Sequence, residues 1–150
     1  MKLSEWLKKE NIPWDSIKAL SVRQPFASLI VIGGKIIEWR SKPIAYRGPL
    51  IICASKNPQI RMNNGKLLPT GAAIGVVNLV DCRPMKKKDL VAACCEDWRG
   101  AVTGYAWVLE HHQEVIPVPV KGIVAPWPWA KRQGIDLEFC PDWHKKEGIW

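Results

Sequence analysis

The sequence predicts an α+β fold, a small mixed β-barrel with two or three helices packed at its ends. The chain has 150 residues, 47% of them hydrophobic, which suffices for one sizeable core but not for two ordinary domains. Short apolar or alternating runs typical of strands predominate, and helical spacing appears in only a few segments. No repeat or linker divides the chain. One barrel-like domain is the arrangement that this pattern favours.

The amino-terminal segment predicts a short amphipathic helix over residues 4–10. The helix is expected to stop before Pro13, because proline disfavours helical conformation at the residue that precedes it. We therefore interpret residues 1–16 as a helical extension and residues 17–150 as the principal domain.

The next elements alternate between strand and helix. Residues 17–22 (IKALSV) predict the first strand. In residues 25–33, Pro25 suits the first helical position and apolar side chains recur at helical spacing. Gly33 or Gly34 then ends the helix with a left-handed cap. Residues 35–40 (KIIEWR) then predict a second strand, which starts at Ile36 after Lys35 at the helix-to-strand junction.

Three further strands and one further helix follow. The strands are expected at residues 49–55, 72–82 and 104–120, the last as one or two strands, with a loop at 56–71, a helix at 86–98 and an irregular segment at 126–150. The apolar run in residues 49–55 is typical of a strand buried on both faces.

Charge and cysteine content narrow the possible partners and compartments. The formal net charge is +8, which favours a polyanion such as nucleic acid as partner. The chain shows no secretory signal and no apolar run long enough to span a membrane, so we expect no membrane association. Five cysteines without a C-x-x-C pair indicate neither a disulfide framework nor a structural zinc site. We expect a cytoplasmic protein without metal or other cofactor.

Three charges cluster directly after the glycine pair. In a strand, the two-residue period sends Glu38 and Arg40 to one face, and the long side chain of Lys35 can bend toward that face. One carboxylate would then lie between two cations and present a fixed array of donors to an anion or a base edge. The alternative is an ion-pair network that closes the barrel mouth. Because Lys35 precedes the strand, we expect its replacement by alanine to cost no more than about 1 kcal/mol.

Residues 20–41 (LSVRQPFASLIVIGGKIIEWRS) resemble the opening of the ASCH domain (activating signal cointegrator homology), whose hallmark G-x-K-x-x-E-x-R matches Gly33, Lys35, Glu38 and Arg40. Residues 46–55, 74–82 and 118–127 resemble later segments of the family in the same order. The resemblance implies a PUA-like β-barrel with a positively lined cleft, a class associated with binding RNA or other nucleic acids.

The resemblance also implies an alternative activity. The wider group is similar to small amidohydrolases that act on acylated cytidine, and some members are described as ribonucleases. Lys35 and Glu38 would then be the catalytic residues, Lys35 to activate water or polarise a carbonyl and Glu38 to move the proton. The amidohydrolase branch has a threonine nucleophile three residues after the lysine, where this chain has Glu38.

Further residues are candidates for ligand contacts. Arg23 and Gln24 precede the predicted helix, where backbone N–H groups favour anions, and Tyr46 and Arg47 form a basic and aromatic turn. The resemblance adds Lys121, from its closing segment. Our leading hypothesis is a nucleic-acid-binding domain that recognises RNA, single-stranded nucleic acid or a modified nucleoside in a basic cleft. A hydrolase is the first alternative, and a protein-interaction adaptor that uses exposed tryptophans is the second.

Overall fold

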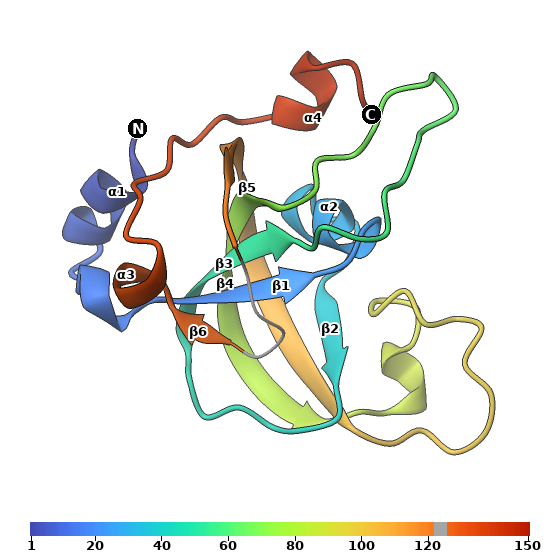
Figure 1. The fold of residues 1–150 in the computed structure, drawn as a ribbon. Coiled ribbons are helices and arrows are strands. Elements are labelled where there is room, and N and C mark those ends of the chain that lie inside the picture. Colours follow the sequence, from blue (N-terminus) through green and yellow to red (C-terminus); the bar gives the residue numbers. More distant parts are fainter. Residues whose placement is uncertain (122–125) are drawn as a thin grey trace.

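A computed structural model describes residues 1–121 and 126–150 of the chain. In chain order, with η marking a 3₁₀ helix, the elements are α1 (Leu3–Lys9), η1 (Trp14–Ser16), β1 (Lys18–Val22), α2 (Phe26–Val31), β2 (Ile37–Arg40), β3 (Gly48–Ala54), β4 (Ala72–Pro84), η2 (Lys87–Asp89), β5 (Tyr105–Pro119), β6 (Trp127–Pro128), α3 (Trp129–Arg132) and α4 (Trp143–Lys146). Figure 1 shows their arrangement.

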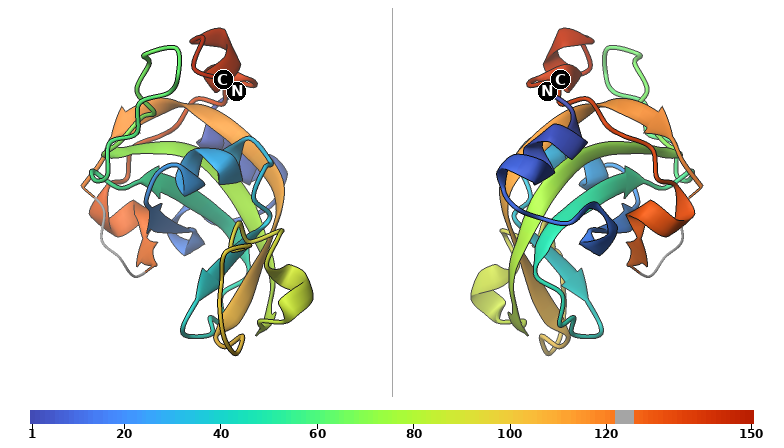
Figure 2. Two further views of the ribbon diagram at one scale, coloured as in Figure 1. Left: turned by 90° about the vertical axis from the view of Figure 1, so that its right-hand side faces the viewer. Right: turned by 90° about the vertical axis from the view of Figure 1, so that its left-hand side faces the viewer.

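The strands in the described residues form one mixed sheet with the order β2-β5-β4-β3-β1-β6. β1 and β3 are parallel, and the other pairs are antiparallel. The sheet curls into a half-barrel (Figure 2), because the two longest strands, β4 and β5, bend where their register shifts. One of these shifts lies between Glu110 and Gln113 of β5, where His111 has a positive φ of 53°. The predicted α+β fold with a small mixed barrel is confirmed.

Two large core clusters lie on opposite faces of the sheet. β3 supplies both, since Leu50 and Ile52 point toward the cluster that contains α2, while Ile51 and Cys53 point toward the cluster that contains α1. All four side chains are at most 1% exposed. The prediction that this strand is buried on both faces is confirmed.

The amino-terminal helix belongs to the second of these clusters. Leu3 and Leu7 of α1 are 0% and 1% exposed and pack there with Trp127 and Trp129. Both oxygens of Asp136 accept hydrogen bonds from Ser4, at its backbone N–H and its hydroxyl. Residues 1–16, which the sequence predicts as an extension, thus contribute a helix to the core.

The prediction of a helix at residues 86–98 is wrong. The segment forms only η2 and a series of turns, and Cys94 has a left-handed φ of 57°. A helix would need the Ala92 carbonyl for its own ladder, but this oxygen accepts hydrogen bonds from the backbone N–H groups of Ile36 and Ile37. Tertiary contacts with the start of β2 thus replace helical hydrogen bonds.

The carboxyl-terminal segment also departs from the sequence-based prediction. Residues 126–150 contain β6, α3 and α4, three short elements where an irregular segment is expected. The end of the chain lies beside the loop between β3 and β4 (Figure 1), where Asn64 donates to the Gly148 carbonyl at 2.7 Å and Lys66 to the Glu147 carbonyl at 2.9 Å.

Candidate functional site

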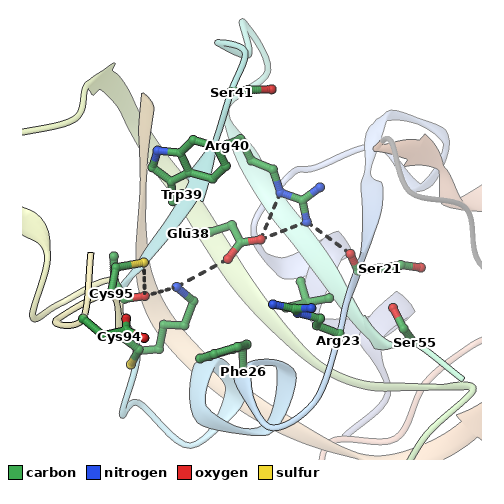
Figure 3. A pocket seen from close by; sticks show the side chains of 14 residues that line it. Ser21, Arg23, Phe26, Glu38, Trp39, Arg40, Ser41, Ser55, Cys94 and Cys95 are labelled. Carbon is green, nitrogen blue, oxygen red and sulfur yellow. Dashed lines mark hydrogen bonds and ion pairs between the residues drawn. The ribbon is translucent and has the colours of Figure 1, made fainter. Parts of the chain in front are cut away.

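A cleft of about 630 Å³ opens beside the start of β2. The end of β1 and the turn that leads into α2 form one side of it, and the turns after η2 form the other. Figure 3 shows Arg23 and Phe26 on the first side and Cys94 and Cys95 on the second, with Glu38 between them. The charged cluster predicted from the sequence therefore lies in a cleft.

Lys35 is held at the base of the cleft. Gly33, with a φ of 89°, follows the end of α2 and turns the chain so that Lys35 lies two residues before β2. The ammonium group donates to the carbonyls of Ile37 and Ala93 at 2.6 and 2.5 Å and lies 3.4 Å from Glu38 Oε1. The ammonium group is thus hydrogen-bonded to two backbone carbonyls and ion-paired with one carboxylate.

The burial of Lys35 corrects one expectation. The side chain is 4% exposed, so it is not the surface-like residue that its place before the strand predicts. Its removal would leave two carbonyl groups and part of a buried carboxylate without their donor. The expected cost of no more than about 1 kcal/mol is therefore too low.

The carboxylate of Glu38 lies between two cations, as the spacing predicts. Its Oε1 faces Lys35, while its Oε2 accepts a hydrogen bond from Arg40 Nε at 2.9 Å and forms an ion pair with Arg40 Nη2 at 2.8 Å. The side chain of Glu38 is 10% exposed. Because both oxygens are engaged, the carboxylate orients the two basic groups and offers little free capacity to accept further hydrogen bonds.

Arg40 also joins two strands across the open side of the half-barrel. Its Nη2 donates to the Ser21 carbonyl of β1 at 3.2 Å, although β1 and β2 are not neighbours in the sheet. Its guanidinium group lies 5.8 Å from the ring centre of Trp107. These contacts fit the alternative interpretation of the cluster, an ion-pair network that closes the barrel mouth.

Arg23 is the exposed cation of the cleft. It follows β1 directly, and its side chain has no hydrogen-bond or ion-pair partner among the residues that the structure describes. A guanidinium group that is not held by a carboxylate can donate to phosphate oxygens without first breaking another contact.

Aromatic side chains line the cleft on two sides. The ring of Phe26 lies 5.7 Å from Lys35 Nζ. The indole of Trp39 donates to the Thr103 carbonyl at 2.8 Å and packs against Trp98 with ring centres 5.6 Å apart. Fixed rings of this kind are suited to contact a planar base.

The formal charge of the cleft is smaller than the net charge of the chain suggests. Three basic side chains (Arg23, Lys35 and Arg40) and two acidic ones (Glu38 and Asp97) line it. The excess is one positive charge, because Glu38 and Asp97 together offset two of the three cations. The cleft therefore suits a polar ring with one anionic group better than a run of phosphates.

The structure places three predicted contact residues away from the cleft lining. Gln24 is 1% exposed and bonds to Ser28 and Pro69. The phenol of Tyr46 donates to the Pro49 carbonyl, and burial raises its pKa to about 12. Arg47 is exposed and donates to backbone carbonyls of its own turn.

Lys121 is exposed and likewise does not line the cleft. Residues 122–125, the rest of the predicted closing segment before Pro126, lie outside the described residues.

Sequence reasoning missed other residues that line the cleft. Cys94, Cys95 and Asp97 come from the segment predicted as a helix, so no pattern indicated that they face Lys35. Desolvation raises the pKa of the Cys95 thiol, which disfavours the thiolate. All five cysteines are free.

No group of three or more potential ligand side chains that could hold a metal is found in residues 1–121 and 126–150. No helix in the same part of the chain is long and apolar enough to cross a membrane.

Comparisons with known proteins agree with the fold and the hallmark. The model of the ASCH domain family matches residues 20–125. Activating signal cointegrator 1 from Homo sapiens is 31% identical over 126 residues, and the protein of the same name from Mus musculus is 30% identical. Each alignment covers 72% of this chain and 21% of the relative, so the chain matches about a fifth of their length.

Solved structures give the same result at the level of the fold. The crystal structure of ASCH from Zymomonas mobilis superposes with a TM-score of 0.54 at 20% identity, covering 70% of this chain and 74% of that chain. A point mutant of that protein gives a TM-score of 0.51, again at 20% identity, over 69% and 76% of the two chains. With the family model matching more than half of its length, the chain belongs to the ASCH domain family.

Proposed function

We propose that the cleft binds single-stranded nucleic acid, with one unpaired base inside the cleft and its phosphate on Arg23. The observation that carries this proposal is that one cleft combines an exposed arginine, two fixed aromatic side chains and, at its floor, the charged cluster of Lys35, Glu38 and Arg40. Arg23 supplies donors for a phosphate, while Phe26 and Trp39 supply faces or edges for a base. The ASCH family, which the resemblance associates with nucleic acids, supports the same class of partner.

The size and charge of the cleft favour one base over a longer run of the strand. A volume of about 630 Å³ accommodates a nucleotide, and the excess of one positive charge matches one phosphate. Neighbouring phosphates would contact exposed basic residues outside the cleft. Lys42, which follows the cleft residue Ser41, is one of these, and Arg47 is another.

The geometry gives less support to a hydrolase. For Lys35 to polarise a substrate carbonyl it would have to turn an N–H group away from its ion pair with Glu38, because its ammonium group also donates to two backbone carbonyls. For Glu38 to act as a base it would have to release Lys35 or Arg40. If the chain hydrolyses RNA or acylated cytidine, the wild type should turn over that substrate and Glu38→Gln should abolish the turnover. If the chain only binds, neither the wild type nor Glu38→Gln should turn over either substrate.

The binding proposal is tested by fluorescence anisotropy with labelled single-stranded RNA over a series of salt concentrations. Arg23→Ala should weaken binding about tenfold and lower the slope of log K against log salt by about 1, because one phosphate contact is lost. Arg132→Ala is the matched control, since Arg132 is also exposed and does not line the cleft. Equal effects of the two changes would show that only overall charge matters.

The base contact needs a separate variant. Phe26→Leu keeps an apolar side chain of similar size but removes the aromatic face, so affinity should fall about fivefold or more while the salt slope stays unchanged. A duplex of the same sequence should bind more weakly than the single strand, because its bases are paired and stacked. Equal affinity for duplex and single strand would contradict the proposal.

A further inference from the structure

A second buried polar network lies behind the turn that leads into α2. Gln24 and Ser28 belong to this turn and to the start of α2, Glu114 to β5, and His144 to α4 at the end of the chain. The exposed fractions of these residues range from 0% for Ser28 to 8% for Glu114. The network thus joins segments that are more than 100 residues apart in the sequence.

The hydrogen bonds of the network have one consistent direction. Gln24 Oε1 accepts from the Ser28 backbone N–H at 2.9 Å, so Gln24 Nε2 is left to donate to Ser28 Oγ at 2.7 Å and to the Pro69 carbonyl at 2.8 Å. Ser28 Oγ lies 2.8 Å from His144 Nε2, and in the neutral ring whose Nδ1 carries the proton, Nε2 accepts from this hydroxyl group. His144 Nδ1 then donates to Glu114 Oε1 at 2.6 Å.

The carboxylate of Glu114 holds His144 at two points. Its Oε1 also accepts from the His144 backbone N–H, at 2.9 Å. The rings of Trp143 and Trp150 pack edge-on against the imidazole, with ring centres 5.1 and 5.9 Å away. The position of the His144 ring is therefore fixed by its surroundings.

The order serine, histidine, carboxylate is that of a hydrolytic triad, but access to the serine is lacking. Ser28 is 0% exposed and lines neither the cleft nor the smaller pocket beside Glu114. A nucleophile needs room for the reacting atom near its oxygen, and Ser28 has none. The network is suited to hold the backbone in place.

The backbone that it holds carries the two cleft residues with which we explain ligand binding. Arg23 and Phe26 face the cleft from the same turn whose buried side chains are Gln24 and Ser28. A shift of this turn would therefore move the phosphate contact and the base contact together. Buried side chains on the side of the turn that faces away from the cleft therefore determine how well the turn is ordered before a ligand binds.

We infer that His144 is a positioning residue for the cleft, acting through Ser28 and Gln24 on Arg23 and Phe26. This inference rests on the proposed function for its consequence in binding, but its structural part is independent of any ligand. His144 lies outside residues 20–125, which the family model matches, so the carboxyl-terminal segment would complete the site of this chain.

The test combines a cavity variant with chemical rescue. His144→Gly removes the imidazole and leaves a space that free imidazole can fill, whereas His111→Gly is the matched control, since His111 is 73% exposed and lies outside the network. Ordering of the turn is measured by hydrogen exchange of the amides of Ala27 and Leu29, which bond to the carbonyls of Arg23 and Pro25. RNA affinity is measured by anisotropy on the same samples.

We expect His144→Gly to speed exchange at both amides and to weaken RNA binding about tenfold, and imidazole to reverse both effects in this variant but not to alter the wild type. Ser28→Ala, which removes only a hydroxyl group, should show the same effects on a smaller scale and serves if His144→Gly does not fold. Unchanged exchange and affinity in a folded His144→Gly or Ser28→Ala protein would overturn the inference. If wild type does not bind RNA, the proposed function fails, and the exchange data alone decide the inference.

Discussion

The replacement of Lys35 by methionine gives the sharpest test of how the charged cluster contributes to stability. Methionine keeps most of the length of the lysine side chain and fills its space, so the change removes the charge and the donors with little loss of packing. The carbonyls of Ile37 and Ala93 would lose their donor, and Glu38 would keep only Arg40.

The expected loss is about 3 kcal/mol of unfolding free energy. A buried acceptor left without its donor costs about 1–3 kcal/mol, and a buried ion pair broken on one side costs about 3–5 kcal/mol. These costs overlap here because the same ammonium group serves all three acceptors, and Arg40 still compensates Glu38, so the sum stays near the lower values.

Urea unfolding provides the measurement. With a slope of about 2 kcal/mol per molar, a loss of about 3 kcal/mol lowers the midpoint by about 1.5 M urea. Lys42→Met is the matched control, because Lys42 is exposed and its change should move the midpoint by less than about 0.3 M. The double change Lys35→Met with Glu38→Gln should recover part of the loss, since it removes the carboxylate that lost its partner. A Lys35→Met protein as stable as Lys42→Met would refute the reasoning.

Three further predictions concern stability, the thiols and the strand contact. Hydrogen bonds from Arg83, aided by one from the Lys86 backbone, hold the pKa of Asp89 below its ordinary value near 3.8, so the stability that this carboxylate contributes is complete above 3.8 and is lost as the pH falls through the lower pKa of the folded state. The difference in urea midpoint between wild type and Asp89→Asn should therefore be largest near neutral pH and shrink in acid. A difference that stays constant with pH would contradict this prediction. Burial raises the pKa of the Cys53 thiol to about 12, so iodoacetamide at pH 8 should label Cys94 in the native protein and leave Cys53 unmodified by mass spectrometry; equal labelling would count against the described core. Arg40→Lys keeps the charge but cannot contact both Glu38 and the Ser21 carbonyl with the same geometry, and should lower stability by about 1–2 kcal/mol, whereas an unchanged melting temperature would show that the strand contact is dispensable.

The periodicity of the sequence correctly predicted side-chain directions where the local pattern of a strand determines which of its faces is buried. The alternation in residues 35–40 predicts that Glu38 and Arg40 share a face, and the structure shows their ion pair. The continuous apolar run in β3 predicts burial on both faces, and its residues alternate between two core clusters. In both cases the local pattern and the tertiary environment favour the same conformation.

The sequence was less informative where distant segments compete with local hydrogen bonds. Residues 86–98 have helical spacing, but the Ala92 carbonyl bonds to the start of β2 and the Ala93 carbonyl to Lys35. The contact of Ser28 with His144 spans 116 residues, and no spacing rule indicates it. A single sequence contains no signal for such pairings, because they depend on how the sheet curls.

The place of the ligand is the central claim, and an NMR titration tests it most directly. Titration of 15N-labelled protein with a short single-stranded RNA should shift the backbone amides of Arg23 and Phe26 and the indole N–H of Trp39, all of which belong to cleft residues, and should leave Arg132 unchanged. Shifts that avoid the cleft while appearing elsewhere, or no shifts at RNA concentrations well above that of the protein, would contradict the account.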